Sequence, residues 1–172
     1  MKKNKVFDEL FVLELANNHW GSLERGLKII EEYGKIVRFN NVKAAIKLQI
    51  RDVDNFVHKD YKDTKDSRYI QKTLRTKMTL EQHKIMADAI RATGCLVMAT
   101  PFDETSVKWA VEIGCDALKV ASSDINDWFL LHKIADTRLP VAVSTGGASL
   151  KSIDDMVCFF ENRNISIAIN HC

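Results

Sequence analysis

Six short apolar runs recur along this chain, and each carries or ends in a polar side chain of the kind that catalytic sites use. The segments between them are mostly amphipathic, with the three- and four-residue apolar spacing that predicts helices. Near-continuous apolar strands that alternate with helices are typical of a parallel sheet whose outer face is covered. The runs comprise residues 11–15, 44–50, 95–100, 117–122, 141–146 and 165–172.

Helix-boundary signals stand between the apolar runs. Ser22 is placed to cap a first helix, which we expect to run to about residue 33 and to stop at Gly34. Thr79 and Gln82 fit a capping box that opens the next helix. Further helices are expected over residues 103–114, 127–135 and 150–160.

This order of elements leaves two architectures open, a doubly wound open sheet and a (β/α)8 barrel. Polar groups near the ends of nearly every strand favour the barrel, because an open sheet gathers its ligand contacts mainly at one switch point. The chain has no G-x-G-x-x-G or G-x-x-x-x-G-K-[ST] motif, so neither a dinucleotide site nor a P-loop is indicated. We therefore expect an α/β fold, a TIM-type (β/α)8 barrel of which strands one to six are present, as a single incomplete domain over residues 1–172.

The composition agrees with one globular core and excludes several other classes. Hydrophobic residues make up 46% of 172 residues and the net charge is +2, which allows a sizeable core. We expect no membrane span, since no apolar run approaches about 18 residues. Acidic residues interrupt the apolar stretch after the basic start, so we expect a cytoplasmic protein rather than a secreted one. The four cysteines lack CxxC spacing, which favours free thiols over a zinc site.

Residues 51–78 depart from the alternation of apolar runs and amphipathic segments. They hold eight Lys and Arg against five Asp, with aromatic residues among them. The acids are interspersed and no nucleic-acid-binding module frames the segment, so we expect no nucleic-acid partner. Because it follows the second strand, the segment belongs on the catalytic face of a barrel, as a lid, a substrate-binding excursion or a disordered stretch.

Charged groups inside the apolar strands predict an anion site. Glu14 lies between two leucines, where a carboxylate is costly to bury unless it is paired or has a function; a structural ion pair is the alternative. Lys47 and Lys119 are also embedded in apolar strands, which indicates that a dianion or carboxylate lies between them. Glu14 would then be available for proton transfer. Hydroxyl donors at the same level are Thr100, Ser122, Ser144 and Thr145.

The turn after the first strand adds amides and an imidazole. Asn17 and Asn18 can hold the hydroxyls of a polar substrate, or can simply build the turn before the helix. His19 follows them directly. His171 follows the sixth strand and would face the same end of the barrel as the other polar residues, unless it is a packed core histidine.

Six strings that contain these residues resemble, in order, the strand motifs of the N-acetylneuraminate (sialic acid) synthase family. The string E-L-A-N-N-H-W-G-S from Glu14 to Ser22 resembles the family's E-I-G-x-N-H-x-G-S. The resemblance extends from about Phe11 to the end of the chain. The other strings are I-K-L-Q at 46–49, A-T-P-F-D at 99–103, L-K-V-A-S at 118–122, V-S-T-G at 143–146 and N-H-C at 170–172.

The resemblance implies a metal-dependent condensation of phosphoenolpyruvate with an N-acetylated amino-sugar aldehyde, of the N-acetylmannosamine type, to a nine-carbon sialic-type acid and phosphate. By position, Glu14 would be the acid/base group, His171 would line the pocket beside it, and Asp124 would stand beside the sugar, where the family often has glutamate. Phosphoenolpyruvate would be held by Lys47, Gln49, Thr100, Lys119, Ser122 and Ser144. The same substrate pocket would include Asn18, His19 and Thr145.

The resemblance also implies partners for the full-length protein. A divalent metal, Mn or Mg, would be held by histidines on strands seven and eight, and an antifreeze-like domain would follow the barrel and mediate a homodimer. Those parts are absent from residues 1–172, so we expect either a piece of a longer protein or a chain that is not catalytic by itself. Ala16, Trp20 and Gly147 depart from the family pattern, which leaves the identity of the sugar open.

Two other interpretations stay open. A phosphoenolpyruvate-dependent synthase acting on a sugar phosphate uses similar chemistry, but it does not share the E-x-x-x-N-H-x-G-S opening. A non-catalytic barrel fragment could bind a phosphorylated metabolite or a partner chain through its open edge. Such a fragment has no need of a buried carboxylate at Glu14.

Overall fold

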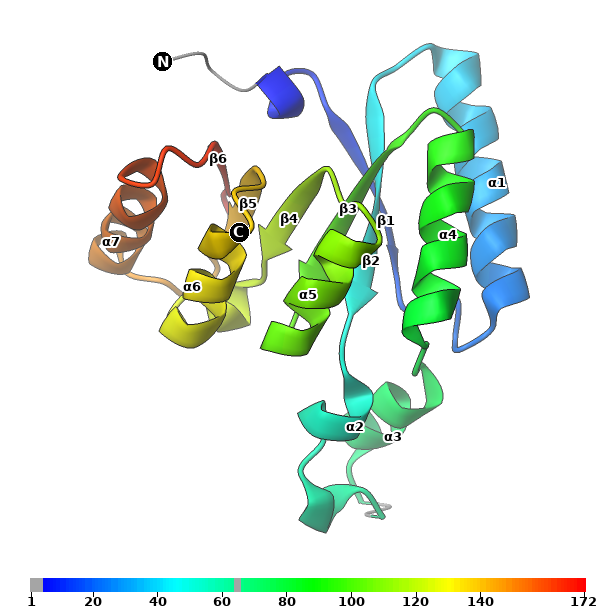
Figure 1. The fold of residues 1–172 in the computed structure, drawn as a ribbon, viewed down its shortest axis with the longest axis horizontal. Coiled ribbons are helices and arrows are strands. Elements are labelled where there is room, and N and C mark those ends of the chain that lie inside the picture. The colour runs from blue at the N-terminus through cyan, green and yellow to red at the C-terminus, as the bar shows by residue number, and fades with distance from the viewer. Residues whose placement is uncertain (1–4, 64–65) are drawn as a thin grey trace.

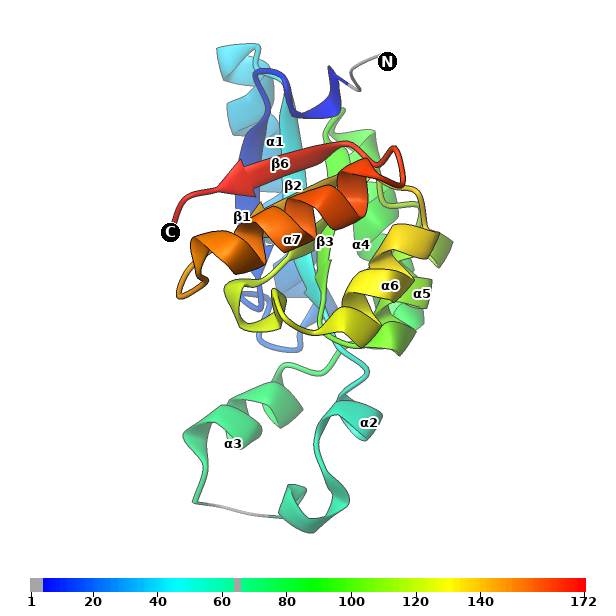
Figure 2. The ribbon, with the colours of Figure 1, turned by 90° about the vertical axis from the view of Figure 1, so that its left-hand side faces the viewer.

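Six parallel strands form one curled sheet (Figures 1 and 2). The computed structural model describes residues 5–63 and 66–172; residues 1–4 of the basic start and residues 64–65 of the 51–78 segment lie outside the described part. The strands follow the chain order from β1 to β6, which confirms the predicted α/β architecture. They are β1 (Phe11–Ala16), β2 (Ala44–Ile50), β3 (Leu96–Pro101), β4 (Ala117–Val120), β5 (Val141–Ser144) and β6 (Ile167–Asn170).

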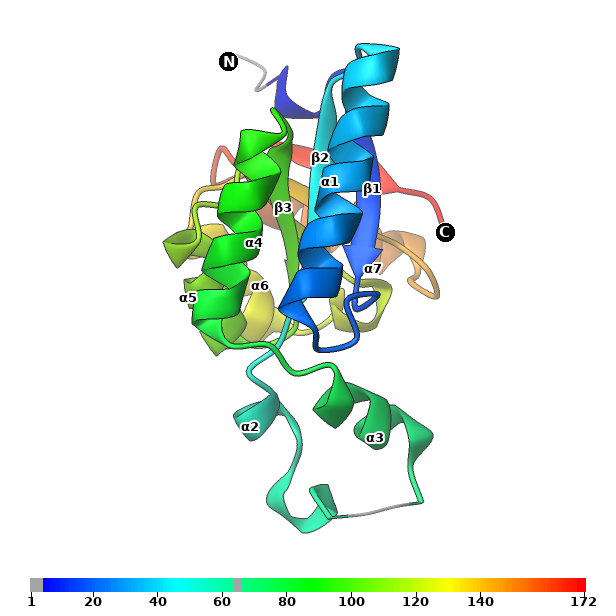
Figure 3. The ribbon, with the colours of Figure 1, turned by 90° about the vertical axis from the view of Figure 1, so that its right-hand side faces the viewer.

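Five longer helices cover the outer face of the sheet, and α1 and α4 lie side by side there (Figure 3). Ser22 caps α1 by accepting a hydrogen bond from the Arg25 backbone, and Thr79 and Gln82 form the predicted capping box of α4. The core between helices and sheet is apolar, with Leu48, Leu118 and Phe160 among its fully buried side chains. The helices are α1 (Leu23–Asn40), α4 (Leu80–Ala92), α5 (Glu104–Glu112), α6 (Trp128–Asp136) and α7 (Leu150–Glu161).

The predicted end of the first helix at Gly34 is wrong. Helix α1 continues to Asn40 and ends at Asn41, whose φ of 49° places it in the left-handed region. Gly34 is buried against the end of α4, where an added Cβ would lie 2.6 Å from Thr93 Cγ2. The glycine therefore serves the close approach of two helices rather than a helix end.

Residues 51–78 contain three short helical elements in place of a plain loop. These are α2 (Val53–Phe56), the 3-10 turn η2 (Lys59–Tyr61) and α3 (Arg68–Arg75). They project beyond the carboxyl end of β2, away from the body of the sheet (Figures 1 and 2). This excursion therefore lies at the edge of the sheet where the predicted site residues gather.

The concave face of the sheet is built in two layers. Its floor is a buried cluster of Ala45, Met98, Ala117 and Ala142, and Phe7 of the 3-10 turn η1 (Lys5–Phe7) packs against it. Side chains alternate across a strand, so the residue two positions further along points to the same face. Lys47, Thr100, Lys119 and Ser144 each follow a floor residue by two positions. They form a polar layer above the floor, at the carboxyl ends of the strands.

The described residues bear on two further expectations. Among them, no helix is both long enough and apolar enough to span a bilayer. All four cysteines are free thiols, as predicted, with Cys95 and Cys115 buried and Cys158 and Cys172 exposed.

Replacing Gly34 by alanine should destabilise the protein although alanine is the better helix former. The new methyl group collides with Thr93, and overpacking of this kind costs about 1–3 kcal/mol. The variant T93S removes Cγ2 and keeps the hydroxyl that donates to the Ile90 carbonyl at 2.7 Å, so the pair G34A/T93S should recover part of the loss. Urea denaturation of the full-length protein measures both, with T93S alone as the control. A G34A variant as stable as the wild type would contradict the close packing.

Candidate active site

The ion pair that the sequence left open as the alternative role of Glu14 is present. Glu14 and Lys47 are register partners across β1 and β2, and their side chains form an ion pair. The Lys47 side chain is 6% exposed and that of Glu14 is 46% exposed, so the pair joins a buried ammonium to a carboxylate at the rim. Lys47 Nζ also donates to Thr100 Oγ1 at 3.3 Å. These two contacts account for two of the three donors of the ammonium group.

An irregularity in β1 holds the Glu14 carboxylate in place. The register with β2 shifts between Glu14 and Ala16, and Ala16 has a φ of 48°. Glycine adopts this backbone conformation without strain, and glycine is the residue usual here in the resembled motif. The Ala16 backbone N–H donates to Glu14 Oε1 at 3.0 Å. The carboxylate is thus fixed between a backbone donor and the Lys47 ammonium.

Lys119 brings a second positive charge to the same lumen. It lies on β4, is half-buried, and donates to the Val120 carbonyl at 3.4 Å. Burial lowers the pKa of Lys119, and the charge of Lys47 lowers it further, against smaller opposing effects from Glu14 and Asp124. Two ammonium groups that repel each other favour an additional anion between them.

The hydroxyl groups lie along the same edge of the sheet in different environments. Ser144 is buried, and Ser122 Oγ accepts a hydrogen bond from the Gly146 backbone at 3.3 Å. Thr145 Oγ1 donates to the Asn170 carbonyl at 3.1 Å, which ties the ends of β5 and β6 together. His171 is exposed beyond the end of β6. Substrate contacts by these residues stay predictions.

Asp124 and Arg51 contribute polar atoms that lack partners. Asp124 ends the 3-10 turn η3 (Ser122–Asp124), and burial raises its pKa, while Arg51 and Lys119 act in the opposite direction. Asp124 Oδ2 and Arg51 Nε are buried and have no hydrogen-bond partner within the described part of the chain. Such atoms are normally satisfied by a ligand or an ordered water. A contact between Asp124 and the substrate stays a prediction.

No motif had singled out Arg51, which the tertiary structure adds to the site. Its guanidinium carbon lies 3.6 Å from the centre of the Phe102 ring, and Nη1 donates to Gln49 Oε1 at 3.4 Å. Phe102 lies far from Arg51 in the sequence, and neither contact belongs to a recognisable motif. The only sequence signal near Arg51 was the excess of positive charge in residues 51–78. Arg51 connects Gln49 with the region of Asp124.

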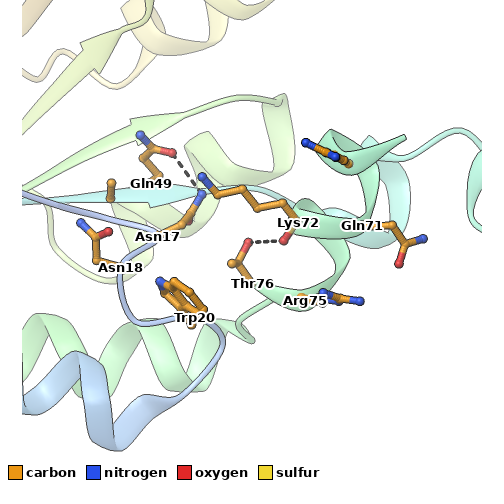
Figure 4. A pocket seen from close by; sticks show the side chains of 10 residues that line it. Asn17, Asn18, Trp20, Gln49, Gln71, Lys72, Arg75 and Thr76 are labelled. Carbon is orange, nitrogen blue, oxygen red and sulfur yellow. Dashed lines mark hydrogen bonds between the residues drawn. The ribbon is translucent and has the colours of Figure 1, made fainter. Parts of the chain in front are cut away.

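A cleft of about 920 Å³ opens beside Gln49 (Figure 4). One wall is the turn after β1, which includes Asn17, Asn18 and Trp20, and the other wall is α3. Asn17 Nδ2 donates to Gln49 Oε1 at 3.2 Å. Gln49 follows Lys47 by two residues on the same face of β2, so the cleft begins roughly 7 Å along the strand from Lys47. The amides of Asn17, Asn18 and Gln49 in its lining suit a polyhydroxy ligand.

His19 lies outside the lining of this cleft. Its side chain is 1% exposed, packs against Gly26 of α1, and accepts a hydrogen bond at Nδ1 from the Gly21 backbone at 3.0 Å. Burial, and to a smaller extent the charge of His83, lowers the pKa of His19 to about 4. The imidazole is therefore neutral at pH 7, with its proton on Nε2, and it stabilises the turn that presents Asn17 and Asn18. A direct contact with substrate stays a prediction.

The residues present do not fit a metal site. Across residues 5–63 and 66–172, no group of three His, Cys, Asp or Glu side chains comes together in a way that could hold an ion. The divalent metal thus stays a prediction about residues outside this chain.

A curled parallel sheet with charged groups at the carboxyl ends of its strands defines the class of (β/α)-barrel enzyme domains. A family model described as the NeuB family matches residues 40–172. The chain belongs to the NeuB family, which confirms the resemblance to the sialic acid synthases.

Solved structures and sequence relatives agree with this assignment. A Chromobacterium violaceum protein, described as spore coat polysaccharide biosynthesis protein E, is 34% identical with a TM-score of 0.93, over 96% of this chain and 49% of that chain. The N-acetylneuraminic acid synthetase of Leptospira borgpetersenii is 26% identical with a TM-score of 0.80, over 95% and 53%. A Campylobacter jejuni pseudaminic acid synthase is 28% identical over 98% of this chain and 49% of its own length. The chain spans about half the length of the curated relatives it matches.

Acid should destabilise the protein through His19. Because its pKa is lower in the folded state, the unfolded chain binds a proton that the folded chain does not between about pH 6.5 and pH 4. The free energy of unfolding should therefore fall across that range, by about 3 kcal/mol for a shift of this size. The variant H19N keeps an acceptor for Gly21 and removes the titration, so urea denaturation should show a weaker pH dependence.

The exposed His132 gives the matched control, H132N. It should lose as much stability between pH 7 and pH 4.5 as the wild type. Equal losses in H19N and the wild type would show that His19 is not the group responsible.

Proposed function

We propose that this chain forms the phosphoenolpyruvate-binding part of a sugar-acid synthase, which joins phosphoenolpyruvate to an N-acetylated amino-sugar aldehyde. The product would be a nine-carbon sialic-type acid, released with phosphate. The observation that carries the proposal is the pair of ammonium groups of Lys47 and Lys119, which face one lumen and repel each other, while only Lys47 forms an ion pair within the described part of the chain. Phosphoenolpyruvate has a phosphate and a carboxylate, and its two anionic groups match the two lysines.

Membership of the NeuB family supports the same reaction class, since the named relatives are sialic, legionaminic and pseudaminic acid synthases. In the proposed reaction, the C2–C3 electron pair of phosphoenolpyruvate forms a bond to C1 of the aldehyde, whose oxygen takes up a proton. Water adds at C2 and loses a proton. The bond from C2 to the phosphate oxygen then breaks, the remaining C2 hydroxyl becomes the keto group, and phosphate leaves with the bonding electrons and the proton of that hydroxyl.

Each residue of the polar layer has a part in this scheme. Lys47 and Thr100 would hold one anionic group of phosphoenolpyruvate and Lys119 the other, with Ser122 and Ser144 as hydroxyl donors. Glu14, held by Lys47 and by the Ala16 N–H, is positioned to exchange a proton with the reacting water or the aldehyde oxygen. The amide-lined cleft beside Gln49 would receive the amino sugar.

Replacing Glu14 by glutamine should abolish turnover while phosphoenolpyruvate still binds. The amide keeps the shape of the side chain but cannot accept and return a proton, whereas the lysines that hold the anion remain. Phosphate release by the full-length protein measures turnover, and calorimetry measures binding. The exposed Glu31, which pairs with Lys35 on the surface, provides the control E31Q, and near-normal turnover in E14Q would rule out the acid/base role.

Removing the Lys119 ammonium should weaken phosphoenolpyruvate binding by about 1.5–3 kcal/mol, the scale of a hydrogen bond to a charged group. Calorimetry on K119A in the full-length protein tests this. The control is K151A, because Lys151 is a surface residue paired with Asp155. An affinity unchanged in K119A would remove this residue from the anion site and would favour a chain that binds some other ligand.

A further inference from the structure

Three cations line the cleft from one helix. Arg68, Lys72 and Arg75 of α3 all contribute to its wall, together with Gln71 and Thr76. Their spacing of four and three residues places them on one face of the helix. Figure 4 shows the Lys72 side chain extended toward Asn17 and Gln49, the amides on the opposite wall. Lys72 is therefore the cation nearest these amides of the two that the figure labels, Lys72 and Arg75.

The cations of this wall are not neutralised by the chain itself. No carboxylate of the described residues lies within 4 Å of Arg68, Lys72 or Arg75, although Lys77 just beyond them pairs with Asp54. The cleft lining contains no Asp or Glu. An unbalanced group of three positive charges beside a concave surface attracts an anionic ligand.

Helix α3 is fixed against the turn that forms the other wall. Gly21 packs so closely on the Arg75 carbonyl that an added Cβ would lie 2.5 Å from its oxygen. Thr73 and Met78 are buried, and Thr76 Oγ1 donates to the Lys72 carbonyl at 2.9 Å. The cations thus belong to a supported wall, at a set distance from the amides, rather than to a free loop.

Trp20 adds an apolar surface at the same place. It is 70% exposed, lines the cleft, and has a φ of 53°, which is strained for a bulky residue. Strain of this kind is concentrated at functional sites. The indole face gives the C–H face of a sugar ring a surface to stack on, while the amides meet its hydroxyls.

We infer that α3 binds an anionic group, a phosphate or a carboxylate, at the end of the acceptor sugar remote from its aldehyde. This inference rests on the proposed function. The aldehyde must reach phosphoenolpyruvate near Lys47, and the cleft begins roughly 7 Å along β2 from there, a gap that a six-carbon chain spans. The far end of the sugar then meets Lys72 and Arg75. The acceptor is accordingly an acidic amino sugar, and a neutral one fills the cleft without engaging α3.

The test compares acceptors in the full-length protein at saturating phosphoenolpyruvate. The probes are N-acetylmannosamine, its 6-phosphate, and the matching hexuronic acid with a carboxylate at C6. We expect kcat/KM to be at least about tenfold higher for one of the two anionic acceptors than for the neutral sugar, as one charge-assisted hydrogen bond provides. The preferred anion identifies the group as phosphate or carboxylate.

The variant K72Q/R75Q should reduce this preference at least about tenfold. The control K59Q/K62Q makes the same charge change in the same excursion, at residues that do not line the cleft, and should keep the preference of the wild type. Equal kcat/KM for neutral and anionic acceptors, or equal effects of both double variants, would overturn the inference while leaving the proposed reaction intact.

Absence of condensation with every acceptor would count against the proposed function instead. The inference then still has a direct test by calorimetry, which needs no turnover. The anionic acceptor should bind the wild type more tightly than K72Q/R75Q, and the same affinity for both proteins would overturn it.

Discussion

The alternation of side chains in six parallel strands is the constraint on which the rest of this structure depends. Outward residues pack beneath the helices, and inward residues meet in one lumen. On the inner face, Ala45, Ala117 and Ala142 are small and form a closely packed floor. Two residues further along the same strands come Lys47, Lys119 and Ser144. Because every second residue of a strand points into the lumen, the apolar floor and the polar layer occupy successive levels there.

The polar layer links folding to binding through its charge. A buried ammonium is costly unless it is paired, and the Glu14 carboxylate stabilises Lys47 directly. Within the described part of the chain Lys119 forms no ion pair, and it donates to the Val120 carbonyl at 3.4 Å. The Lys119 ammonium therefore stays without an ion-pair partner among the described residues, at the edge where barrel enzymes place their substrates. The same arrangement that limits the cost of burying Lys47 creates the attraction for a small dianion.

The excursion between β2 and α4 gives the site its second wall. Residues 51–78 interrupt the alternation of strands and helices. They nevertheless supply Arg51 near Asp124 and the cationic face of α3. Close packing of Gly21 on the Arg75 carbonyl joins this wall to the turn after β1. Trp20, which departs from the family motif, belongs to that turn and lines the same cleft. The excursion and the unusual residue therefore belong to one surface, the part of the site where relatives with different sugars are expected to differ.

The sequence by itself determined the strands, most of the helix caps and the residues of the polar layer, because these depend on local patterns. The apolar runs located all six strands, and the capping box at Thr79 required only neighbouring residues. The roles of Gly34, His19 and Arg51 were decided by the tertiary structure alone. Gly34 is set by Thr93 of another helix, His19 by its burial beside α1, and Arg51 by Phe102 on a different loop. A residue's contacts across the fold come from segments that no local pattern specifies, so its function there appears only when those segments meet.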